Sequence, residues 1–137
     1  MGAGVSSWSL ARAVSKAGQL GVVSGTALDV ILARRLQVGD IGGHMRRALS
    51  KFPIPDVAQR IIDRYFVADG KASDKPFKSK PFPSEKPSRH LEELTVASNF
   101  VEVYLAKEGH DGLVGINYLE KIQPPTLPSI YGAMLAG

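Results

Sequence analysis

Along the chain, segments whose hydrophobic residues recur at helical spacing alternate with short continuous runs of hydrophobic residues. Apolar residues recur every three or four positions over residues 7–17, which predicts an amphipathic helix with Ser6 or Ser7 at its start. The next apolar run, residues 20–23, is short and includes two adjacent valines, as is typical of a buried strand. Helical spacing then returns over residues 27–36. The chain therefore opens with an expected helix, strand and helix.

The rest of the chain continues this alternation. Further helices are expected at residues 44–51, from Pro55 onward, at residues 89–107, and from Pro128 onward. Residues 69–88 are polar and rich in lysine and proline, which predicts a surface loop. Residues 113–118 predict a second strand, and their glycines and aliphatic side chains indicate burial on both faces.

The order of the elements indicates an α/β fold. Strands that alternate with helices imply parallel strands joined by right-handed crossovers. Two parallel strands alone cannot form a sheet covered on both faces. A glycine-rich turn at residues 1–4 is of the kind that follows a strand, and the last helix is of the kind that precedes one. We therefore expect residues 1–137 to be an internal piece of a larger α/β domain.

Composition narrows the classes of protein to consider. The 137 residues are enough for one domain with a core, and the net charge of +4 is spread along the chain. No platform of aromatic and basic residues accompanies the charge, so nucleic-acid binding is not expected. The chain has no cysteine, which excludes thiolate chemistry and suits a reducing cytoplasm. No apolar run reaches the length of a membrane span, so no membrane partner is expected.

Two blocks of sequence resemble the nitronate monooxygenase family, formerly called 2-nitropropane dioxygenases. The opening "MGAGVSSWSLARAVSKAGQLGVVSGT" resembles that family's first loop, first helix and second strand. "LVGINYLEK" resembles its third strand, and "LPSIYGAMLAG" resembles the helix before its next strand. The resemblance covers residues 1–37 and about 90–137. It leaves residues 40–88 as a helical insertion rich in proline and lysine.

Members of this family are FMN-dependent (β/α)₈ barrels, and the resemblance implies that the chain is a partial TIM barrel. Ligands of such barrels lie at the carboxyl ends of the strands. The residues expected to contact the cofactor are therefore Met1, Gly2, Ala3, Gly4, Ser24, Gly25, Thr26, Asn117 and Lys121. The amide of Asn117 could bond the pyrimidine edge of the flavin, and Lys121 could place positive charge beside it.

The resemblance also implies an activity. The whole enzyme would oxidise an alkyl nitronate, a small-molecule substrate, with O₂ as the second reactant. The family's catalytic histidine and phosphate-binding loops are expected beyond Gly137, so the isolated chain is expected to bind FMN weakly and to be inactive. Two alternatives stay open: a related flavin-dependent enoyl reductase, and a non-catalytic fragment or interaction module built from the helices of residues 27–107.

Each candidate residue also has a plainer interpretation. Residues 2–4 suit a tight turn, and residues 24–26 suit a turn that ends a strand and caps a helix. Asn117 suits a turn after a strand, and Lys121 suits a solvated surface.

The histidines are not expected to be catalytic or to bind metal. His110 lies in "KEGHDG", which looks like the family's catalytic motif, but it precedes the second strand instead of following one. We expect it to bond carbonyl groups at a helix end. His44 and His90 are expected at the surface near helix starts, and the three residues are too scattered for a metal site.

Overall fold

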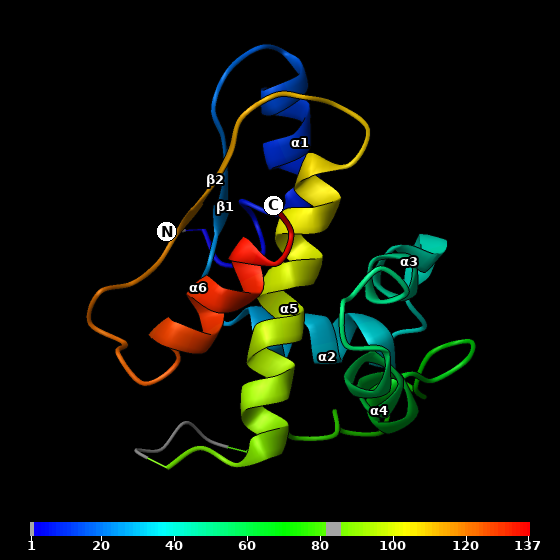
Figure 1. Ribbon diagram of the computed structural model, residues 1–137. Helices are drawn as coiled ribbons and strands as arrows, with labels where there is room; N and C mark the ends of the chain where they lie inside the picture. Colours follow the sequence, from blue (N-terminus) through cyan, green and yellow to red (C-terminus); the bar gives the residue numbers. More distant parts are fainter. Residues whose placement is uncertain (1, 82–85) are drawn as a thin grey trace.

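The computed structural model describes residues 2–81 and 86–137 and has a mixed α/β fold (Figure 1). The helices of this part of the chain are α1 (Trp8–Lys16), α2 (Leu28–Gln37), α3 (His44–Leu49), α4 (Pro55–Tyr65), α5 (Arg89–Lys107) and α6 (Thr126–Met134). The strands are β1 (Gly21–Ser24) and β2 (Val114–Asn117), and a short 3₁₀ helix, η1 (Ile41–Gly43), precedes α3. The predicted order of helices and strands is confirmed.

The two strands form a parallel sheet that helices cover on one face. Val23 of β1 packs with Ala11 of α1 and Ala106 of α5 in a small buried cluster. Most of the opposite face stays open, since Val22 is 41% exposed and Leu113, just before β2, is 74% exposed, whereas Ser24 at its carboxyl end is buried. The prediction that residues 113–118 are buried on both faces is therefore wrong, because the described helices contact only one.

The two edges of the sheet have different neighbours. The strands pair in register from Gly21 opposite Val114 to Ser24 opposite Asn117. On the other edge of β1, the Ser24 N–H donates to the Ser6 carbonyl at 2.8 Å, so the opening turn lies beside this strand. The outer edge of β2 has no partner strand among the described residues.

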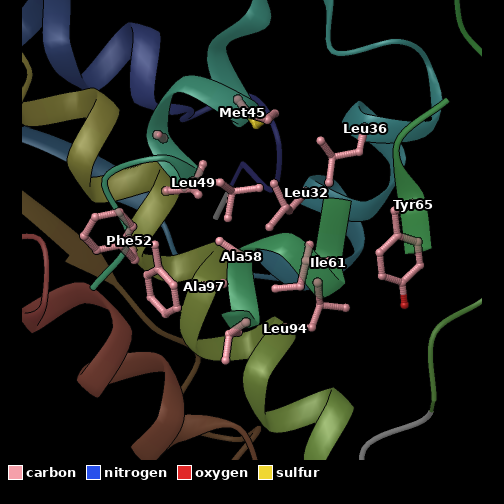
Figure 2. Packing of buried hydrophobic residues seen from close by; sticks show 14 of the residues in the cluster. Leu32, Leu36, Met45, Leu49, Phe52, Ala58, Ile61, Tyr65, Leu94 and Ala97 are labelled. Atoms are coloured by element: carbon pink, nitrogen blue, oxygen red, sulfur yellow. The ribbon is translucent and has the colours of Figure 1, made fainter. Parts of the chain in front are cut away.

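Helix α5 runs through the middle of the molecule and contacts every other helix named above (Figure 1). On one side it packs with α2, α3 and α4 around the largest buried cluster (Figure 2). Met45, Leu49, Phe52 and Ile61 of that cluster belong to residues 40–88. The segment predicted as an insertion thus supplies much of the main core.

A buried carboxylate ties three helices together. Glu102 of α5 accepts the Trp8 N–H at the start of α1 and the Arg35 Nη1–H of α2, each at 2.8 Å. Ser7 occupies the N-cap position of α1, but its side chain makes no capping bond. The predicted serine cap is therefore replaced by a carboxylate from α5, which also suits the positive end of the helix dipole.

Two prolines mark the starts of helices. Pro55 is the first residue of α4, as predicted. Helix α6 begins at Thr126, so the prediction that it starts at Pro128 is wrong by two residues. A proline is tolerated in the first turn because the N–H groups there have no acceptor within the helix.

Candidate functional site at the carboxyl edge of the sheet

Three segments predicted to border a cofactor meet where the strands end. Ser24 and Asn117 are opposite each other in the sheet, and the Gly25 N–H donates to the Asn117 carbonyl at 2.8 Å. The opening turn joins them through the bond from Ser24 to the Ser6 carbonyl. Within that turn the Val5 and Ser6 N–H groups both donate to the Gly2 carbonyl at 2.9 Å.

Not every predicted residue reaches this edge. Ala3 and Gly4 lie in the exposed turn, and Met1 lies outside the described residues. Asn117 is exposed at the edge, and its side-chain amide makes no hydrogen bond to any described residue. Lys121 lies in the loop before α6, exposed and with no ion pair to the described part of the chain.

Two hydroxyl groups at this edge are buried without a partner. Ser24 is 4% exposed, and neither its Oγ nor the Oγ1 of Thr26 has a hydrogen-bond partner among the described residues. A buried polar group left unpaired costs roughly 1–3 kcal/mol. The predicted helix cap does not account for them, because Ala27 is the N-cap residue of α2 and no side chain caps the helix. The fold of the described residues therefore leaves both hydroxyls unsatisfied.

Tyr118 and Asn99, which the sequence did not single out, support this edge from the side of the helices. The Tyr118 hydroxyl lies 2.9 Å from both the Asn99 Oδ1 and the Ser129 carbonyl oxygen, and burial raises the pKa of this phenol. A Cβ atom on Gly25 would lie 2.5 Å from the Tyr118 ring, so a side chain at residue 25 would displace this ring. The signal in the sequence was weak, because Asn99 lies among other polar residues of the same helix, Thr95, Ser98 and Glu102.

A pocket of about 190 Å³ lies beside this edge, between the start of α2, α5 and α6. Its walls are mostly aliphatic side chains and prolines, among them Leu28, Leu91, Ile122 and Pro125, and Thr26 and Asn99 add polar groups. A smaller pocket of about 50 Å³ against Tyr118 shares Thr26 as a wall. Thr26 therefore borders a space behind the strand ends, distinct from the open sheet face next to Asn117.

The contacts of the three histidines involve none of the residues at the carboxyl edge. His110 Nε2 bonds the Ala106 carbonyl at 2.7 Å and its Nδ1 accepts the Gly112 N–H at 3.1 Å, which confirms the predicted role at the end of α5. His90 is half-buried, not fully at the surface: it bonds the Tyr65 hydroxyl at 2.8 Å, and burial lowers its pKa. The His44 ring lies 4.9 Å from the Trp8 ring and is tilted by 51° to it.

Two further findings hold for residues 2–81 and 86–137. These residues contain no cluster of three or more histidine, aspartate or glutamate side chains able to hold a metal ion. None of their helices is both long enough and apolar enough to cross a membrane.

Comparisons with known proteins gave no relative from which to transfer a function. No family model matches the chain, and neither the curated proteins nor the solved structures contain a match. The interpretation of the site therefore depends on its own geometry and on the resemblance in the sequence.

Proposed function

We propose that the chain is part of an FMN-dependent oxidoreductase of the nitronate monooxygenase kind and forms one wall of its flavin site. The observation that carries this proposal is the buried, unpaired Ser24 hydroxyl next to the unbonded Asn117 amide, at the carboxyl ends of two parallel strands. Ligands of α/β barrels lie at this end of the strands. Helices on only one face of the sheet are consistent with a partial (β/α)₈ barrel, whose open face would line the interior.

The residues present suit a planar, polar-edged group. The Ser24 hydroxyl and the Asn117 amide can each donate and accept hydrogen bonds, and they lie on adjacent strands. Residues 2–4 of the opening turn carry no side chain larger than a methyl group, so their backbone can approach a ring closely. When bound, FMN would carry electrons from an alkyl nitronate to O₂. The absence of cysteine suits a cytoplasmic location.

The flavin would lie against the open sheet face and not in the neighbouring pocket. Small-molecule sites usually enclose about 300–1,000 Å³, whereas the pocket between α2, α5 and α6 holds about 190 Å³. No described histidine lies at the carboxyl edge, and His110 precedes β2. The base that acts on the substrate would come from outside these 137 residues, so we expect the chain alone to bind FMN weakly without turnover.

Titration of FMN with the chain, followed by flavin fluorescence, tests the proposal. We expect weak but saturable binding, which Asn117→Ala weakens about fivefold to tenfold, the value of one hydrogen bond. Gln123→Ala is the matched control, because Gln123 is exposed in the loop that follows and belongs to no predicted site. An unchanged affinity of Asn117→Ala would remove this residue from the site, and no saturable binding at all would refute the flavin proposal.

Ser24→Ala separates a ligand contact from a structural role. Removing an unsatisfied buried hydroxyl does not break any hydrogen bond to a described residue, so the free chain should be as stable as the original or slightly more stable. FMN binding should weaken at the same time. A loss of stability without a change in FMN affinity would instead assign Ser24 to the fold.

A further inference from the structure

We infer that the pocket between the start of α2, α5 and α6 binds a compact, neutral and mostly apolar molecule that carries one hydrogen-bonding oxygen. This site is separate from the proposed flavin wall and does not depend on it. Three features of the pocket support this inference: its size, the unsatisfied hydroxyl of Thr26 beside it, and the neutralised charge at its rim.

The size of the pocket suits a single ring with a short substituent. A dry apolar cavity of about 150 Å³ is known to accommodate benzene. The pocket here holds about 190 Å³ and is lined mainly by aliphatic side chains and prolines. Such a lining stabilises a ligand through burial of its apolar surface. The remaining volume leaves room for one polar substituent.

The polar end of the pocket is at Thr26. Thr26 borders both this pocket and the smaller one, and its Oγ1 is buried in the free chain without a hydrogen-bond partner among the described residues. The next residue, Ala27, has the left-handed φ of 55°, which is unfavourable for a residue other than glycine. Backbone strain of this kind is concentrated at functional sites. In the first turn of α2 the Val30 N–H bonds the Asp29 carboxylate, whereas the Leu28 and Asp29 N–H groups have no acceptor among the described residues and can donate to a ligand oxygen.

The charges around the pocket favour a neutral ligand. Asp29 in the first turn of α2 forms an ion pair with Lys80, and both side chains are mostly buried. The other carboxylate oxygen of Asp29 accepts the Val30 N–H at 2.8 Å. Glu92 lines the pocket but is exposed to solvent. The lining therefore offers no unpaired buried charge, within the part of the chain that the structure describes, to hold an anion or a cation.

Benzyl alcohol and toluene are suitable probes because they differ by one hydroxyl. Amide NMR spectra of the full 137-residue chain would follow each titration. We expect benzyl alcohol to shift the Leu28 and Ile122 amides saturably and to bind about fivefold to tenfold more tightly than toluene, as expected of one hydrogen bond. No saturable shift of these amides, or equal affinities for the two probes, would overturn the inference.

Two variants test the polar contact. Thr26→Val removes the unpaired hydroxyl at nearly constant shape and should abolish the preference for benzyl alcohol. Thr95→Val is the matched control, because Thr95 lines the same pocket but its hydroxyl already donates to the Leu91 carbonyl at 2.8 Å. That variant should keep the preference. A preference that survives Thr26→Val would contradict the role of Thr26.

A third variant tests the location. Val30→Phe adds bulk to the pocket wall and should weaken binding of both probes. Unchanged binding would place them elsewhere and overturn the inference. Because no probe is a flavin, failure here leaves the FMN proposal untouched, and the reverse also holds.

Discussion

Replacing Glu102 by glutamine should destabilise the fold strongly. Its two carboxylate oxygens accept separate bonds of 2.8 Å, one from the Trp8 N–H and one from the Arg35 guanidinium. The Glu102 side chain is 4% exposed and that of Arg35 28%, so water cannot replace these bonds easily. Glutamine has one oxygen, and its NH₂ group would face a donor. The loss of one charge-assisted hydrogen bond is worth about 1.5–3 kcal/mol.

Urea denaturation followed by circular dichroism measures this change. We expect Glu102→Gln to lower the free energy of unfolding by about 2 kcal/mol, and Glu102→Ala by about 3–5 kcal/mol, because alanine leaves Arg35 without its buried partner. Glu120→Gln is the control, since Glu120 is exposed and forms no ion pair with a described residue. If Glu102→Gln unfolds at the same urea concentration as this control, the carboxylate does not hold α1 and α2 to α5.

Three further predictions concern other parts of the fold. In thermal melts, Gly132→Ala should destabilise the fold by several kcal/mol, on the order of an overpacked core. The added Cβ would overlap the Val96 carbonyl of α5. Gly115→Ala is the control, because its Cβ meets only ordinary contacts and should change the stability little. Burial raises the pKa of Tyr118, so the folded state disfavours its ionised form. Stability should therefore be intact below about pH 10, the usual tyrosine pKa, and fall as the pH rises, with a smaller loss in Tyr118→Phe. Ala27→Gly removes the strain of the left-handed φ at the start of α2 and should raise the free energy of unfolding by about 1 kcal/mol. A decrease in that free energy would show that the backbone there is not strained.

Local patterns in the sequence were enough to predict the elements and their order. The apolar spacing of α1, α2 and α5 and the prolines near the starts of α4 and α6 are local signals that the structure bears out. The parallel pairing of β1 with β2 followed from the alternation of strands and helices. Boundaries were less certain because the first turn of a helix lacks internal hydrogen bonds, which is why Pro128 was mistaken for the start of α6.

Features that depend on contacts distant in sequence could not be predicted. Glu102 caps α1 from a position 94 residues away, and no local pattern shows this. Residues 40–88 have a composition typical of an insertion, but Met45, Phe52 and Ile61 pack into the main core with α5. The exposure of Leu113 depends on which face the helices cover, and apolar residues alone do not specify that face.

The candidate site was predictable only in part. Small and polar residues at the expected strand ends singled out Ser24, Thr26 and Asn117. The sequence could not show that the hydroxyls of Ser24 and Thr26 are buried without partners, or that Tyr118 lies against Gly25, because these are properties of the packed chain.

The most direct test of the flavin proposal is to map FMN on the chain by amide NMR. We predict saturable shifts of the Gly4, Ser24, Gly25 and Asn117 amides, which surround the carboxyl edge of the sheet, and none near His110 at its opposite end. Shifts confined to the surface of α3 and α4, or no saturable shift at any concentration of FMN, would contradict the account.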